Sequence, residues 1–282
     1  MNFHTLQMMG KRFIIIAIGG IKKLDQVFTS CSGIPYLRLG VGEPLVLIHG
    51  LGEVKEGWNN QFEFADQYEL IIPDLRGHGE HTTNKDISIS HFARDIISLL
   101  KELRIENAHI CGLSMGGMVA QEIYRLAPHM CRSLLLVSTY HYMPKRLAKL
   151  LITYRKARSL STRPSMSKDT AARISFSSWN NKTFEEFHQF YKPNHDVFLK
   201  SVQACLHVNN QKLLPKINIP TLIIGGQYDS VIPVWMQLFM HKKIRHSEFV
   251  IFKNTGHIAK LESKETFNRI VRNFLKKHRI VS

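Results

Sequence analysis

The sequence predicts an α/β protein, with a mostly parallel central sheet flanked by helices and interrupted by a helical cap insertion. Short apolar runs alternate with helical patterns along most of the chain, and one long central segment lacks strand-like runs. The apolar runs are residues 44–49, 68–74, 108–112, 133–137, 221–225 and 248–252. Runs that are apolar throughout are typical of strands buried on both faces of a parallel sheet, and alternation with helices favours that arrangement.

Helices and a lead-in hairpin account for the segments between these runs. Residues 27–30 and 36–39 flank a Ser32-Gly33 turn, which predicts a hairpin. Residues 89–103 carry one apolar face, with Ser88 or Ser90 as the candidate N-cap, so a helix is expected there. Further helices are predicted at residues 116–126, 183–191, 234–240 and 263–277.

The break in the alternation predicts the domain organisation. Residues 25–139 and 207–282 form the expected α/β core, residues 140–206 a helical cap, and residues 1–24 an extension of uncertain role. Because the insertion lies between two strands of the sheet, we expect it over the carboxyl edge, where such folds bind ligands.

Composition excludes several classes of protein. At 282 residues, 44% hydrophobic and 21% charged, the chain is neither disordered nor a membrane bundle. Its net charge is +16, and residues 140–216 hold 14 Lys plus Arg against 4 Asp plus Glu, or +10. This basic segment is interpreted either as a solvated face or as an attractor for anionic substrates. It lacks glycine-flanked aromatic RNA motifs and zinc-ligand spacing, so no nucleic-acid partner is expected.

Cysteine usage and the N-terminus bear on localisation. Four cysteines without paired spacing indicate reduced thiols and a cytoplasmic protein. Residues 13–21 are apolar, which is too short to span a bilayer, and Lys22 and Lys23 stand where a signal peptide needs small residues. The segment is interpreted as an extra N-terminal strand or as the product of a start codon assigned too early. Export or lipid anchoring is the alternative.

The strongest chemical signal is a GxSxG motif at residues 112–116, between a predicted strand and a predicted helix. A nucleophile elbow requires this strand–turn–helix context, because the sharp turn lifts the serine hydroxyl above the sheet. The turn needs small neighbours, and Gly112 and Gly116 supply them. Ser114 is therefore the predicted nucleophile.

The chain resembles the α/β-hydrolase superfamily, particularly its small capped serine esterases and enol-lactonases. The resemblance covers residues 27–277 and is carried by the motifs LVLIHGLG (45–52), IIPDLRGHG (71–79), GLSMGGMVAQ (112–121), IPTLIIGGQYDSVIP (219–233) and NTGHIAKLE (254–262).

The resemblance implies a triad in the chain order serine, acid, histidine. Asp229 and His257 each follow a late strand in that order and are the predicted acid and base. The backbone N–H groups of Leu51 and Met115 are the implied oxyanion-hole donors. His49 is assigned a structural role, since the family's base comes later in the chain. No metal or organic cofactor is implied.

Two alternatives concern the identity of the acid and the residues that line the substrate pocket. Some relatives take the acid from the end of the strand before the insertion, but residues 138–140 contain no carboxylate here. In the insertion, Phe184, Phe187 and Tyr191 form a helical stripe that either packs the cap or lines an acyl pocket. Trp179 is a candidate pocket residue, and Trp179→Ala is expected to change the ranking of acyl-chain lengths.

The predicted function is hydrolysis of a small carboxylic ester, lactone or thioester through an acyl-enzyme on Ser114. Alternatives on the same fold are an acyltransferase, a carbon–carbon bond hydrolase and an aminopeptidase. A non-catalytic ligand receptor is the alternative from another class, because fold alone does not fix function. The expected partner is a small ester-like molecule. The sequence predicts no membrane span and does not define the oligomeric state.

Overall fold

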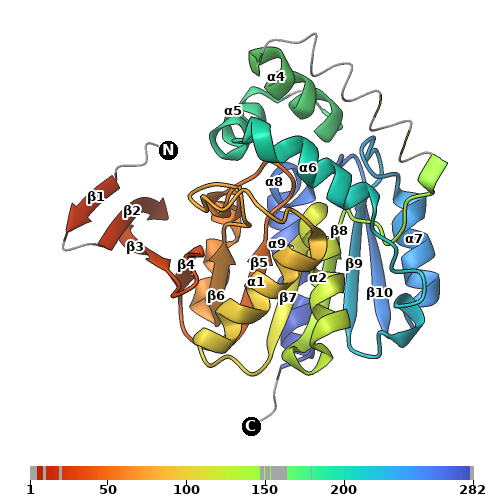
Figure 1. The fold of residues 1–282 in the computed structure, drawn as a ribbon, viewed down its shortest axis with the longest axis horizontal. Coiled ribbons are helices and arrows are strands. Elements are labelled where there is room, and N and C mark those ends of the chain that lie inside the picture. Colours follow the sequence, from red (N-terminus) through yellow and green to blue (C-terminus); the bar gives the residue numbers. More distant parts are fainter. Residues whose placement is uncertain are drawn as a thin grey trace.

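The computed structural model describes residues 5–8, 11–18, 21–146, 149, 153, 164–178 and 180–279. A sheet of ten strands runs through it in the order β1-β2-β3-β4-β6-β5-β7-β8-β9-β10 (Figure 1). The strands are β1 (Thr5–Met8), β2 (Lys11–Ile18), β3 (Ile21–Thr29), β4 (Pro35–Leu39), β5 (Glu43–Ile48), β6 (Tyr68–Pro73), β7 (Ala108–Leu113), β8 (Cys131–Val137), β9 (Thr221–Gly226) and β10 (Ser247–Phe252).

The sheet is mixed, with its parallel part in the half that follows the hairpin. Strands β6, β5, β7, β8, β9 and β10 pair in parallel, whereas β1 to β4 pair antiparallel and β4 joins β6 antiparallel. The predicted mostly parallel sheet is therefore confirmed, and so is the lead-in hairpin, formed by β3 and β4. Within residues 1–24 lie β1, β2 and the start of β3, in keeping with the interpretation of this segment as extra strand.

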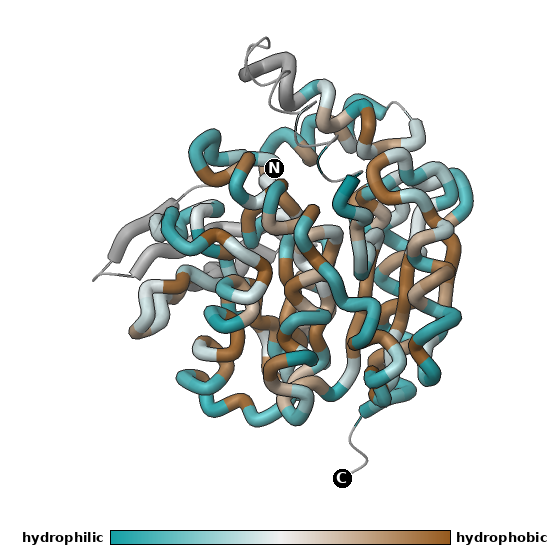
Figure 2. The backbone as a smooth tube through the Cα atoms, turned by 45° about the vertical axis from the view of Figure 1, so that its right-hand side comes forward, coloured by the Kyte–Doolittle hydropathy of each residue, from teal (hydrophilic) through white to brown (hydrophobic). Residues whose placement is uncertain are grey.

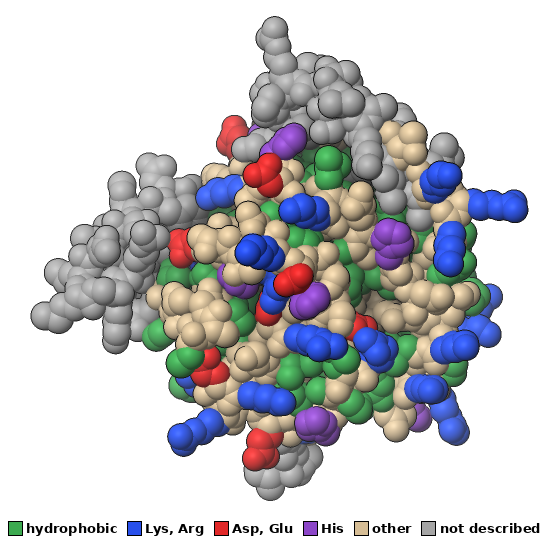
Figure 3. Space-filling model, in the orientation of Figure 1, with side chains coloured by type: hydrophobic (Ala, Val, Ile, Leu, Met, Phe, Trp, Pro, Cys, Tyr) green, Lys and Arg blue, Asp and Glu red, His purple; other side chains and the backbone are tan. Residues whose placement is uncertain are grey.

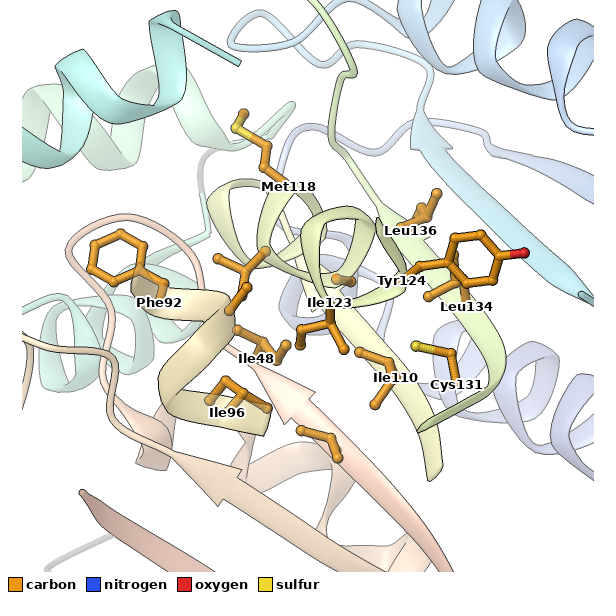
Figure 4. Close-up of a cluster of buried hydrophobic side chains, with 14 of the residues drawn as sticks. Ile48, Phe92, Ile96, Ile110, Met118, Ile123, Tyr124, Cys131, Leu134 and Leu136 are labelled. Carbon is orange, nitrogen blue, oxygen red and sulfur yellow. The ribbon is translucent and has the colours of Figure 1, made fainter. Parts of the chain in front are cut away.

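Alternate residues of the parallel strands enter two different cores. Val46, Ile110 and Leu134 pack on one face of the sheet, while Leu47, Cys111 and Leu135 pack on the other. All six are at most 1% exposed, as expected for strands buried on both faces. The brown stretches of Figure 2 follow these strands, and Figure 4 shows the first core.

Helices cover both faces. The first face packs against α1 (Ile89–Glu102), α2 (Met115–Leu126) and α7 (Val234–Lys243), through residues such as Phe92, Ile123 and Met240. The second packs against the 3-10 segment η1 (Lys55–Asp66) and α9 (Lys264–Lys277), through Trp58 and Phe267. Short elements η2 (Pro128–Met130), η3 (Leu214–Lys216) and α8 (Ala259–Glu262) complete the layers.

The predicted helical insertion is present between β8 and β9. Helices α4 (Pro164–Ser175), α5 (Asn181–Phe190) and α6 (His195–Leu206) lie over one end of the sheet (Figure 1). In the described part of the chain, no helix combines the length and apolar character needed to cross a membrane.

Most predicted helices have their expected ends, and the exceptions have local causes. Ser88 caps α1, as predicted, by accepting the His91 N–H at 3.2 Å. Helix α5 begins two residues before the predicted start because the Asn180 side chain caps it. Segment η1 was not predicted, since it has no side-chain cap and two of the side chains it buries, Lys55 and Gln61, are polar.

Candidate active site

Ser114 stands at the sharp turn between β7 and α2. Its backbone adopts φ 54° and ψ −115°, a conformation that costs free energy for any residue with a side chain. Two hydrogen bonds hold this conformation: the Ser114 N–H donates to Val137 O at 2.8 Å, and Thr139 Oγ1 donates to Ser114 O at 2.8 Å. The hydroxyl-bearing residue is half-buried, as an elbow at the floor of a site requires.

Close backbone approaches explain the glycines on either side of the elbow. A Cβ on Gly112 would lie 2.1 Å from Gly116 O, and one on Gly116 would lie 2.3 Å from Ile48 O. Neither neighbour can yield, because both are backbone atoms of adjacent elements. The turn therefore excludes side chains at both positions.

The structure brings Asp229 and His257 together. Asp229 follows β9 and His257 follows β10, and His257 Nδ1 lies 2.8 Å from Asp229 Oδ2. The other Asp229 oxygen accepts the N–H groups of Val231 at 2.9 Å and Ile232 at 2.8 Å, so the carboxylate is held at both oxygens. Both residues are 6% exposed. The bond at Nδ1 directs the opposite ring nitrogen, Nε2, away from the acid.

The loop after β5 holds the predicted oxyanion donor Leu51. His49 Nε2 accepts the Leu75 N–H at 3.1 Å, so its Nδ1 carries the proton and donates to Gly50 O at 2.8 Å. Burial lowers the pKa of His49, which keeps the ring neutral in this role. The geometry agrees with the structural role predicted for His49. At the other predicted donor, Met115 is the first residue of α2, where an N–H has no intrahelical acceptor.

The cap contacts three of the loops that carry predicted site residues. The His257 N–H donates to Ser175 O at 2.7 Å, Ser230 Oγ donates to Ile174 O at 2.7 Å, and the Lys192 N–H donates to Gly52 O at 2.8 Å. These bonds join the ends of α4 and α5 to the loop that carries the predicted base His257 (the base loop), the loop that carries Asp229, and the loop that carries Leu51 (the oxyanion loop).

A single carboxylate strengthens the junction between the cap and the base loop. Glu262 Oε2 accepts the Gly256 N–H at 2.6 Å, and Glu262 Oε1 accepts the Ser177 N–H at 2.9 Å and the Ser177 hydroxyl at 2.6 Å. Glu262 lies in the motif at residues 254–262, but no role was predicted for it from the sequence. Its partners in the cap are remote in sequence, so no local pattern could have identified them.

The aromatic stripe of α5 is buried in the cap. Phe187 stacks on Tyr191 with 4.7 Å between ring centroids and meets Phe176 edge-on at 5.5 Å. Phe184 lies 5.8 Å from Phe176. These contacts favour the packing interpretation, and an acyl-pocket role stays a prediction. Trp179, the candidate pocket residue, lies outside the described residues.

Across the described ranges, no three His, Cys, Asp or Glu side chains gather as a group of potential metal ligands. The predicted site residues themselves offer a hydroxyl, an imidazole, a carboxylate and backbone N–H groups.

Comparison with known proteins identifies the family. Residues 43–264 match the family described as alpha/beta hydrolase fold. This chain is an α/β hydrolase. Lipase 3 of Moraxella sp. (strain TA144) is 27% identical over 266 residues, covering 84% of this chain and 79% of the lipase. The 3-oxoadipate enol-lactonase 2 of Acinetobacter baylyi is 25% identical over 248 residues, covering 83% and 88% of the two chains.

Among solved structures, a thermophilic esterase from Thermogutta terrifontis is similar to this α/β hydrolase with a TM-score of 0.80 at 22% identity. The superposition covers 99% of both chains. At that identity the similarity establishes the fold, and it includes the capped architecture.

Proposed function

We propose that this α/β hydrolase is a serine hydrolase that cleaves a small carboxylic ester, lactone or thioester through an acyl-enzyme on Ser114. The observation that carries the proposal is the 2.8 Å bond between His257 and Asp229, at the same sheet edge as the strained Ser114 turn. The lipase and enol-lactonase relatives support the substrate class.

The proposed mechanism assigns one role to each group. His257 Nε2 removes the proton from Ser114 Oγ as that oxygen attacks the substrate carbonyl. Asp229 holds the imidazole in the tautomer with the proton on Nδ1 and stabilises the imidazolium that forms. The Leu51 and Met115 N–H groups receive the oxyanion. His257 then protonates the leaving group, and water attacks the acyl-enzyme by the same route in reverse.

The proposed mechanism requires a bond that forms on substrate binding. In the described residues, the hydrogen bonds of His257 run from Nδ1 to Asp229 and from its backbone N–H to Ser175. We expect Nε2 to bond Ser114 Oγ in the substrate complex, because catalytic hydrogen bonds commonly form or tighten at that stage.

The test is Ser114→Ala, measured on a panel of p-nitrophenyl esters of graded acyl length. We expect kcat to fall by about 10⁴ to 10⁶ with the circular dichroism spectrum unchanged. Ser98→Ala is the matched control, because Ser98 is an exposed serine on α1. A variant at Ser114 that keeps activity within tenfold would remove this residue from the mechanism.

A fluorophosphonate probe separates an enzyme from a ligand receptor on the same scaffold. The native chain should be labelled at Ser114, and the Ser114→Ala variant should not, because the probe requires an activated hydroxyl. Absence of labelling in the native chain would favour the receptor.

A further inference from the structure

A buried ion pair lies beside the proposed oxyanion loop and takes no part in the mechanism above. Lys260 Nζ is 3.3 Å from Glu53 Oε1, and the two side chains are 2% and 6% exposed. Removing two charges from water costs free energy that their attraction only partly returns, so such a pair is weak evidence of stabilisation. Its position suggests a different role.

Glu53 holds the loop that carries Leu51. Its side-chain Oε2 accepts the Gly50 N–H at 3.1 Å and so holds the peptide that precedes Gly50. Gly50 O is held by two other donors, the backbone N–H of Glu53 at 3.2 Å and His49 Nδ1 at 2.8 Å. Gly50 O belongs to the same peptide unit as the Leu51 N–H. Because a trans peptide is planar with C=O and N–H on opposite sides, fixing Gly50 O fixes the direction of the Leu51 N–H.

Lys260 is held from the side of the base. It lies in α8, three residues after His257, and its Nζ donates to Gly57 O. The ammonium also stands over the Trp58 ring, 4.8 Å from its centroid. Gln61 Nε2 donates to Lys260 O at 3.1 Å, which fixes the lysine backbone. The ion pair thus connects the loop after β10 to the loop after β5.

Charge gives the pair a second consequence. An unpaired carboxylate this close to the Gly50 N–H would repel the oxyanion that the neighbouring Leu51 N–H is proposed to bind. Because the Glu53 side chain is only 6% exposed, such repulsion would be poorly screened. The ammonium of Lys260 neutralises Glu53, so the carboxylate can position the loop without opposing charge development in the substrate.

We infer that Lys260 and Glu53 are positioning residues for the oxyanion hole: the Glu53 side chain holds the Gly50 backbone that leads into the Leu51 N–H, and Lys260 neutralises Glu53 and anchors it to the loop that carries His257. This inference rests on the proposed serine hydrolase function. It concerns transition-state binding, so its effect should appear in kcat more than in KM.

The experiment is a double-mutant cycle on p-nitrophenyl acetate hydrolysis with Lys260→Met, Glu53→Gln and the combined variant. Glutamine keeps an oxygen for the Gly50 N–H but removes the charge. Lys260→Met should lower kcat by about tenfold or more, with KM within about threefold, and weaken inhibition by phenylboronic acid, which forms a tetrahedral adduct. In the Glu53→Gln background, Lys260→Met should lower kcat by less than about threefold. Lys277→Met is the matched control, because Lys277 pairs with Glu248 at 2.7 Å in an exposed ion pair.

Equal losses in the two backgrounds, or no loss in either, would overturn the inference, since a lysine that only fills space costs the same in both. Should Lys260→Met not fold, two charge-free variants replace it. Glu53→Ala/Lys260→Met, which lacks an acceptor for the Gly50 N–H, should have a kcat about tenfold below that of Glu53→Gln/Lys260→Met. Equal kcat values in these two would overturn the inference. Wild-type turnover that does not depend on Ser114 would instead overturn the proposed function.

Discussion

Replacement of His78 by asparagine should make the protein less sensitive to acid. His78 is 2% exposed and lies with its ring 5.3 Å from that of His49 and 6.2 Å from Phe92. Burial, together with the neighbouring His49, lowers the pKa of His78 from 6.5 to about 3. The folded protein therefore keeps this ring neutral at pH values where the unfolded chain protonates it.

The size of the effect follows from this difference in pKa. Between pH 6.5 and 3 the unfolded state binds more protons than the folded state, so stability falls as the pH falls through that window. At pH 5 the unfolded ring is almost fully protonated and the folded ring is neutral, which costs about 2 kcal/mol relative to pH 8. Burial also lowers the pKa of His109 and of His141 to about 4, so the wild type should lose more than this in total.

Urea unfolding at pH 8 and pH 5 measures the loss for wild type and variant. Asparagine can still donate to Arg76 O, the partner of His78 Nδ1 at 3.1 Å. His78→Asn should reduce the loss between the two pH values by about 2 kcal/mol, whatever its absolute stability. His207→Asn, at an exposed position, controls for loss of a histidine as such. A pH dependence equal to that of the wild type would refute the assignment of His78 as a buried neutral group.

Two further changes test the loops around the site. Gly116→Ala should lower the free energy of unfolding by about 3 kcal/mol or prevent folding, because its Cβ would lie 2.3 Å from Ile48 O; urea unfolding measures this. Gly33 has φ +80°, but a Cβ there would have nothing within 4 Å, so Gly33→Ala should lower the free energy of unfolding by only about 1 kcal/mol. Equal losses for the two variants would contradict the steric argument. Glu262→Gln should lower kcat for ester hydrolysis by about tenfold, because the base loop loses charge-assisted bonds to the cap. Glu265→Gln is the control in the same assay, because the Glu265 side chain is 82% exposed. If the two variants had the same kcat, a role for Glu262 would be contradicted.

The local parts of the fold and site were predictable from sequence because their causes are local. The strand–turn–helix around Ser114 follows from glycine spacing and two flanking patterns. The partnership of Asp229 and His257 is not local: it was implied by the resemblance to α/β hydrolases, and the structure joins the two side chains at 2.8 Å. Their catalytic roles remain proposals.

Contacts between remote segments carried no sequence signal. The sequence contains no sign that Lys260 is buried, yet its side chain is only 2% exposed. Its charge is compensated by Glu53 and by Gly57 O, which are both remote from it in the sequence. Binary patterning assigns charged residues to the surface, so it fails where a partner arrives from elsewhere in the fold. The chain is basic, with a net charge of +16, and Lys and Arg side chains are spread over the face shown in Figure 3.

The bonds between cap and core limit how this enzyme can be altered. Since Ser175, Ser177 and Lys192 hydrogen-bond to the base loop and the oxyanion loop, the insertion is part of the scaffold that shapes those loops. Exchanging it for the insertion of a relative would change the cap helices and the alignment of these loops together. A chimera would need to keep the backbone course at Ser175 and Lys192 and the side chain of Ser177 to preserve these bonds.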